Sequence, residues 1–97
     1  METAVRCNIP ILTVINNNSY MSIYDNSRFP VAIQKYNVKT LGGQFAEVAA
    51  AMGAYAEKIT EPDEIIPAIK RGLTATASGE PAVLEFITCD EGQFSKY

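Results

Sequence analysis

The stretch that decides the fold runs from Ile11 to Tyr20 and reads Ile-Leu-Thr-Val-Ile-Asn-Asn-Asn-Ser-Tyr. Its first half is almost continuously apolar, which is typical of a parallel strand covered on both faces. The strand then ends abruptly in three carboxamides. In open α/β sheets ligands bind outside the carboxyl ends of parallel strands, and an asparagine offers both an oxygen acceptor and an NH₂ donor. We therefore expect a ligand crevice where the strand over residues 11–15 ends.

The rest of the chain predicts elements that suit such a strand. Residues 2–8 have the character of the last turns of a helix. Residues 16–40 are polar and irregular, which predicts a long loop with at most one short helical turn, and loops of that length are usually functional. The remaining pattern predicts a helix over 44–52, a strand over 54–59, a helix from about 61 to 76 and a strand over 82–88.

This alternation of strands and helices predicts βαβ units with right-handed crossovers. The expected fold class is α/β, with a small three-layer parallel sheet and flanking helices. Apolar stripes mark both helices: Phe45, Val48, Ala49 and Met52 in the first, and Ile65, Ile66, Ile69 and Leu73 in the second. Pro67 falls inside the second helix, either in its first turns or at a kink. Three strands leave apolar surface uncovered, which implies a partner or a further segment.

Composition limits the function. Residues 1–97, of which 47% are hydrophobic and 20% charged, make one compact domain, and the polar end of the chain, 89–97, is expected to be a mobile tail. A net charge of −3 weighs against nucleic-acid binding. The chain has no histidine, so it cannot form a hydrolytic triad by itself. No stretch is a membrane span, and a cytoplasmic protein is expected.

Two cysteines, Cys7 and Cys89, lie far apart in the sequence without the CxxC spacing of a metal knuckle or a redox pair. We expect both to be small buried apolar residues.

A resemblance covers nearly the whole chain, from Glu2 to about Asp90. The lead-in Glu-Thr-Ala-Val-Arg at residues 2–6, followed by the strand and its asparagines, resembles the diphosphate-binding C-terminal domain of thiamine diphosphate enzymes of the acetolactate synthase and pyruvate decarboxylase type. The segments at 41–46, 51–54, 61–65 and 81–86 also resemble this family, in the same order. The Gly-Asp-Gly turn that forms the first half of the family motif does not occur in this sequence. The resemblance implies a partial thiamine diphosphate-binding, flavodoxin-like domain.

The resemblance also implies a site for Mg²⁺ and the cofactor's diphosphate. By this similarity Asn17 supplies a side-chain ligand to Mg²⁺, Ser19 supplies a main-chain carbonyl ligand, and Tyr20 and Met21 flank the cofactor. Asn16 takes the place of Asn17 if the alignment slips by one residue. Hard oxygen ligands of this kind suit Mg²⁺, which commonly shares its shell with phosphates. Met21 stands where many relatives have glycine.

From the residues alone, a strand-ending turn is the favoured interpretation of the asparagines, and the resemblance is what favours the ligand role. Glu85, inside an apolar strand, is expected at a strand edge or an interface rather than as an unusual acid.

The function implied by the resemblance is that of a 2-keto acid decarboxylase or acetolactate-synthase-like enzyme, a lyase or transferase. Its activating glutamate belongs to another domain and has no counterpart here. We therefore expect a domain fragment that has no catalytic residue and no turnover alone, and that self-associates into a homodimer. Two alternatives remain: a non-catalytic homodimerising or regulatory interaction module, and an unrelated small α/β domain.

Overall fold

A computed structural model describes residues 1–21 and 23–90. Their contacts divide the chain into two compact units. The first unit holds residues 1–17 and 44–87, and the second holds residues 18–43 with the segment that begins at Thr88. Most of the predicted tail, from 91 to 97, lies outside the described residues, so its mobility stays a prediction.

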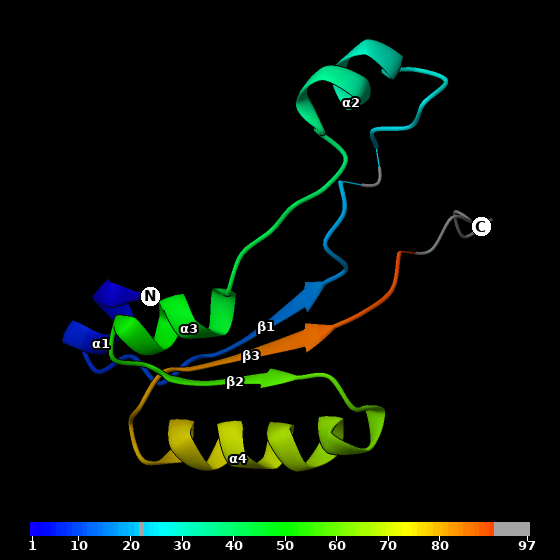
Figure 1. Ribbon diagram of the computed structural model, residues 1–97. Coiled ribbons are helices and arrows are strands. Elements are labelled where there is room, and N and C mark those ends of the chain that lie inside the picture. Colours follow the sequence, from blue (N-terminus) through cyan, green and yellow to red (C-terminus); the bar gives the residue numbers. More distant parts are fainter. Residues whose placement is uncertain (22, 91–97) are drawn as a thin grey trace, which may run out of the picture. The chain divides into compact units, whose positions relative to one another are not determined.

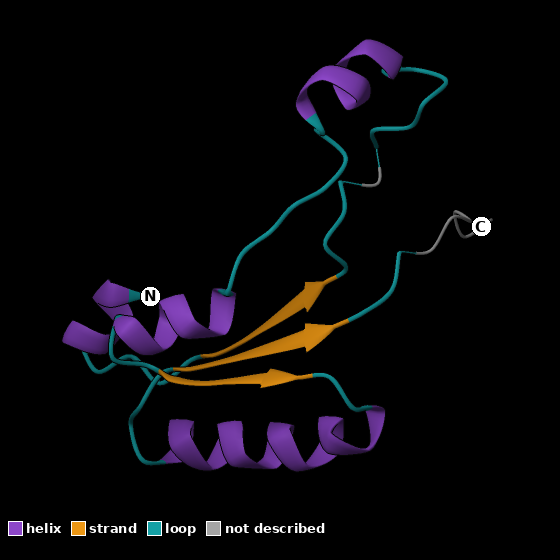
Figure 2. Cartoon of the chain, viewed as in Figure 1, coloured by secondary structure: helices purple, strands orange, loops and turns teal. Residues whose placement is uncertain are grey.

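The first unit contains a parallel three-stranded sheet between helices. In chain order its elements are helix α1 (Glu2–Arg6), strand β1 (Leu12–Asn17), helix α3 (Phe45–Ala51), strand β2 (Tyr55–Ile59), the 3₁₀ turn η1 (Pro62–Glu64), helix α4 (Ile65–Ala77) and strand β3 (Ala82–Ile87). The strand order is β1-β3-β2, with every pairing parallel. Helices α1 and α3 cover one face and α4 covers the other (Figure 1, Figure 2). The predicted three-layer α/β fold is confirmed.

The register of the sheet decides which side chains share a face. Leu12 pairs with Ala82 at one end of β1, and Asn17 pairs with Ile87 at the other. Because side chains alternate along a strand, Ile15 and Asn17 point to the same face as Glu85. That face is covered by α3, so the end of β1 and the middle of β3 meet beneath one helix.

Helix α4 packs closely on the sheet because its buried residues are all small. They are Ala68, Gly72 and Ala75. A Cβ built on Gly72 would lie 2.9 Å from Leu12 Cδ1 and 3.3 Å from Leu84 Cδ1, so a side chain at this position would require both leucines to shift. Of the predicted stripe, Ile65 and Ile69 pack against the core, whereas Ile66 and Leu73 are more than half exposed.

On the opposite face, the predicted stripe of α3 lines an open groove. Only Ala49 of that stripe is buried, together with Ala46, which the stripe did not include. Phe45, Val48 and Met52 border a groove of about 280 Å³ beside Ile15 of β1. The large apolar side chains therefore flank the sheet instead of filling the core, because β1 is an edge strand of this three-stranded sheet.

The second unit is the long loop with a helix in it. Helix α2 (Pro30–Tyr36) begins at a proline, whose fixed φ suits the first helical position. The predicted single helical turn is thus a seven-residue helix. The loop begins and ends in an isolated antiparallel bridge between Tyr20 and Thr40.

Three local expectations are settled by the structure. Strand β1 continues through Asn16 and Asn17 rather than ending at Ile15. Pro67 is the third residue of α4, a first-turn position where no intrahelical donor is needed. The expectation that both cysteines are buried is wrong, since Cys7 and Cys89 are exposed. Each lies just beyond the end of an element, where the chain leaves the core.

In the described part of the chain, no helix combines the length and the apolar character that crossing a membrane requires.

The close contact of α4 with the sheet predicts a strong effect of Gly72→Val. The added atoms meet Leu12 and Leu84, and overpacking of this kind costs about 1–3 kcal/mol of unfolding free energy. Ala77→Val is the matched control, because it places the same β-branched residue at an exposed position of α4. Urea unfolding of both variants measures the difference, and equal midpoints would contradict the packing described here.

Candidate functional site

Asn17 is the last residue of β1, at the carboxyl end of the sheet. The neighbouring strand β3 runs parallel to β1 and ends beside it at Ile87. The side chain of Asn17 is largely buried, with 8% of the residue exposed. The sequence predicted Asn17 in the loop after the strand, whereas in the structure it is the last strand residue and is more enclosed than an open loop residue would be.

Asn17 is held by a buried carboxylate. Its Nδ2 donates to Glu85 Oε1 over 2.6 Å, and the other carboxylate oxygen, Glu85 Oε2, accepts from the backbone N–H of Ala46 over 2.8 Å. Glu85 is completely buried in the central strand. The carboxylate therefore joins the end of β1 to the first turn of α3 through β3.

Glu85 is the residue next to Asn17 that the sequence interpretation placed wrongly. The expected position at a strand edge or interface is contradicted by its location in the central strand β3. The signal was present, because an acidic residue stands alone within the apolar run Pro-Ala-Val-Leu-Glu-Phe-Ile at 81–87. A buried charge needs partners, and these come from residues 68 and 39 positions away in the sequence.

The other three predicted site residues belong to the second unit. The Ser19 carbonyl accepts a hydrogen bond from Leu41 N–H over 2.9 Å, and Met21 N–H donates to the Lys39 carbonyl over 2.8 Å. Tyr20 lies between them in the bridge to Thr40. Ser19, Tyr20 and Met21 thus form one side of a short antiparallel pair, whose other side is residues 39–41.

The backbone of this segment is turned at Ser19, whose φ of 58° lies in the left-handed region. Asn18 stabilises the turn, because its Oδ1 accepts from Tyr20 N–H over 3.0 Å. The Lys39 ammonium lies 5.3 Å from the centre of the Tyr20 ring. These contacts order the loop by itself, while a role for Tyr20 and Met21 in cofactor binding stays a prediction.

The donor set of the predicted residues fits Mg²⁺ better than it fits a softer metal. Among residues 1–21 and 23–90, no group of three or more His, Cys, Asp or Glu side chains is placed to hold a metal. The candidates are the side-chain amide oxygen of Asn17 and the main-chain carbonyl oxygen of Ser19, both hard oxygen atoms. Hard neutral oxygens of this kind leave the metal's charge to be balanced by phosphate oxygens.

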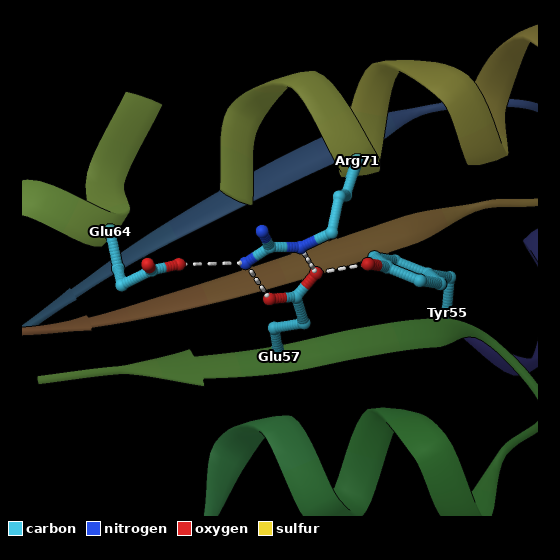
Figure 3. Close-up of polar contacts among 4 residues, drawn as sticks. All are labelled: Tyr55, Glu57, Glu64 and Arg71. Atoms are coloured by element: carbon cyan, nitrogen blue, oxygen red, sulfur yellow. Dashed lines mark hydrogen bonds and ion pairs between the residues drawn. The ribbon is translucent and has the colours of Figure 1, made fainter. Parts of the chain in front are cut away.

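A second polar cluster lies on the α4 face of β2 and has a structural role (Figure 3). Arg71 of α4 binds Glu57 of β2 through two hydrogen bonds, from Nε over 2.8 Å and from Nη2 over 2.7 Å. Tyr55 donates its hydroxyl to the same carboxylate, and Glu64 lies 3.3 Å from Arg71. The cluster fastens α4 to the edge strand β2 at the surface.

These contacts shift the protonation of the cluster. The Arg71 hydrogen bonds lower the pKa of the Glu57 carboxyl, although partial burial opposes them. The bond to Glu57 raises the pKa of the Arg71 guanidinium. Desolvation, and then the bond to Glu57, raises the pKa of the Tyr55 hydroxyl above 10.0.

The fold and the polar end of β1 define a small α/β domain that presents polar groups at the carboxyl edge of a parallel sheet. Comparison with known proteins gives the family. Residues 1–86 match the family described as "Thiamine pyrophosphate enzyme, C-terminal TPP binding domain". The chain belongs to this family, and thiamine pyrophosphate is another name for thiamine diphosphate.

Two relatives extend the comparison. The chain is 35% identical over 91 residues to a probable acetolactate synthase of Mycobacterium bovis, and equally to the acetolactate synthase large subunit IlvG of Mycobacterium tuberculosis. Each alignment covers 90% of this chain and 16% of the relative. The chain thus spans about a sixth of the length of these relatives. The match excludes the alternative of an unrelated small α/β domain.

The Arg71–Glu57 contact predicts a loss of stability in acid. Because the folded-state pKa of Glu57 lies below its ordinary value of 4.5, the stabilisation is present above that value and is lost as pH falls through the folded-state pKa. Unfolding free energies measured from pH 6 to pH 2 are expected to fall less steeply in Glu57→Gln than in the wild type.

Glu64→Gln is the control within the same cluster, since Glu64 makes one longer contact to Arg71 and is more exposed. Its acid profile is expected to stay closer to that of the wild type. Identical profiles for Glu57→Gln and the wild type would show that the contact does not persist in solution.

Proposed function

We propose that this chain binds the diphosphate of thiamine diphosphate together with Mg²⁺ at the carboxyl end of β1. Family membership supports the cofactor. The observation that carries the site is the fixed Asn17 side chain, whose NH₂ group is bound to buried Glu85. Its Oδ1 lies on the other side of the amide carbon and is the atom suited to a metal.

The roles of the chain's own residues follow from that arrangement. Asn17 Oδ1 and the Ser19 carbonyl act as ligands of Mg²⁺, and Tyr20 and Met21 flank the diphosphate. The bound cofactor supplies the carbanion chemistry by which 2-keto acids are attacked, and the protein supplies binding and orientation. In a complete enzyme we propose acetolactate-synthase-like or 2-keto acid decarboxylase activity. The 97 residues contribute no acid or base to it and have no turnover by themselves.

We also propose a cytoplasmic location. Both cysteines are exposed and unpaired thiols. Such thiols persist in a reducing compartment, whereas in an oxidising one they pair or react.

Isothermal titration with thiamine diphosphate tests the site. Saturable binding is expected with Mg²⁺ and not without it, and Asn17→Ala is expected to weaken it by about tenfold or more, since it removes a metal ligand. Asn16→Ala is the matched control. Asn16 is exposed on the opposite face of β1, and its loss is expected to leave the affinity unchanged.

A loss of affinity in Asn16→Ala but not in Asn17→Ala would move the ligand by one residue. Absence of binding in the wild type, with the fold intact, would contradict cofactor binding by this chain and favour the second function below.

A second candidate function is a non-catalytic, homodimerising or regulatory interaction module. The observation that favours it is the groove beside β1, where Val48 and Met52 are about half exposed. Exposed apolar side chains next to an open sheet edge are typical of a surface that another chain covers. We propose a second copy of this chain as that partner.

Sedimentation of Val48→Glu tests the dimer. A charge in the groove is expected to raise the dimer dissociation constant by at least about tenfold, which corresponds to about 1.4 kcal/mol. Ala50→Glu, at an exposed α3 position that does not line the groove, is the control and is expected to dimerise as the wild type does. A wild type that sediments as a monomer at all concentrations would overturn the proposal.

A further inference from the structure

We propose that Glu85 is a positioning residue, which sets the direction of the Asn17 amide and so decides which of its two atoms faces the metal. The inference rests on the proposed function, because it explains how Asn17 comes to present oxygen at the end of β1. It adds to that function a residue that makes no contact with metal or cofactor itself.

The two ends of an asparagine side-chain amide are alike in shape and opposite in hydrogen-bonding chemistry. Oδ1 only accepts hydrogen bonds and the NH₂ group only donates them. Rotation by half a turn exchanges the two atoms without any change in volume, so packing alone does not choose between them. Mg²⁺, however, requires the oxygen, since the lone pair of an amide nitrogen is delocalised into the carbonyl group and is not available to a metal.

Glu85 sets the orientation of the Asn17 amide, because a carboxylate accepts hydrogen bonds and does not donate them. Its Oε1 lies 2.6 Å from Asn17 Nδ2. With the amide turned over, Oδ1 would face the carboxylate oxygen at that distance, and two acceptors would meet in a buried place. Glu85 is completely buried and Asn17 nearly so, which leaves little water to relieve that repulsion.

Because of the second carboxylate oxygen, a glutamine at position 85 cannot accept from both partners of Glu85. Oε2 accepts from the Ala46 backbone N–H over 2.8 Å, and a backbone N–H in the first turn of α3 cannot be turned over. Both partners of Glu85 are therefore donors. A glutamine at this position satisfies Ala46 with its oxygen, but then presents its NH₂ group to Asn17.

The neighbours of Glu85 in the sheet leave this arrangement undisturbed. In register it lies between Ile15 of β1 and Lys58 of β2. Lys58 is exposed, and its ammonium donates to Gln44 Oε1 over 3.0 Å.

Exchanging the amide and the carboxylate between positions 17 and 85 is expected to restore the hydrogen bond that either single substitution breaks. In Glu85→Gln, the introduced NH₂ group accommodates Asn17 only if the Asn17 amide turns over, so that its nitrogen faces the metal position. In the double variant Asn17→Asp with Glu85→Gln, the carboxylate introduced at the end of β1 accepts from that NH₂ group and presents its second oxygen outward. Asn17→Asp alone places two carboxylates against each other in a buried site.

The experiment compares these three variants with the wild type and with Glu47→Gln. Glu47→Gln makes the same change of charge at an exposed position on α3. Three properties are measured on the full chain: the ¹H–¹⁵N signals and hydrogen exchange of the Asn17 side-chain NH₂ group, the thermal midpoint, and the Mg²⁺-dependent affinity for thiamine diphosphate.

In the absence of ligand, the Asn17 NH₂ signals are expected to be shifted and slow to exchange in the wild type and in Glu47→Gln. They are expected to move, with faster exchange, in Glu85→Gln. Asn17→Asp is expected to lower the thermal midpoint, and the double variant is expected to restore it toward the wild-type value. Unchanged Asn17 signals in Glu85→Gln, or a double variant no more stable than Asn17→Asp, would overturn the inference.

With Mg²⁺ and cofactor, Glu85→Gln is expected to bind about tenfold more weakly, the loss typical of a residue that orients a metal ligand. The double variant is expected to recover affinity, which a merely structural role of Glu85 would not produce. If no form of the chain binds the cofactor, the proposed function fails, while the NMR signals and thermal midpoints still decide the role of Glu85.

Discussion

The buried carboxylate of Glu85 is the constraint on which the rest of this structure depends. Burying a carboxylate costs folding free energy unless hydrogen-bond donors surround it. Here the donors are the side chain of Asn17 and the backbone of Ala46. One group therefore fixes the end of β1, the middle of β3 and the start of α3 relative to one another, and a displacement of any of the three leaves a buried polar atom without its partner.

The two faces of the sheet are built on different principles. Beneath α4 the contact is close, because Ala68, Gly72 and Ala75 let the helix backbone approach the strands. Beneath α3 the core is thin, and large side chains such as Val48 and Met52 lie along an open groove next to β1. On the α4 side, the ion pair between Arg71 and Glu57 joins the helix to β2 at the surface. On the α3 side, we propose that a second copy of the chain covers the groove.

Family membership and the site rest on different kinds of support. The family follows from a match over residues 1–86 and from an ordered series of short motifs. The proposed site is supported by the chemistry at one position, where a buried acceptor holds an asparagine at the carboxyl end of a parallel strand. The second proposed ligand, Ser19, has its own local order, with a left-handed backbone and a bond to Leu41.

The sequence by itself determined the type and order of the elements, because apolar periodicity and turn residues are local properties. It predicted the parallel α/β sheet, the helical turn that became α2, and a run of asparagines directly after an apolar strand, although β1 itself extends through Asn17. Sequence similarity, also a property of the chain alone, gave the family and pointed to Ser19, Tyr20 and Met21.

Only the tertiary structure decided which residues are buried. Strand order β1-β3-β2 placed the last strand in the centre of the sheet, and that turned Glu85 from an expected edge residue into a buried partner of Asn17. The tertiary structure also left Cys7 and Cys89 exposed. In α4 it buried the small residues Ala68, Gly72 and Ala75 against the sheet and left Ile66 and Leu73 of the predicted stripe exposed. The physical reason is that burial depends on contacts between residues far apart along the chain, and the Asn17–Glu85 bond spans 68 positions.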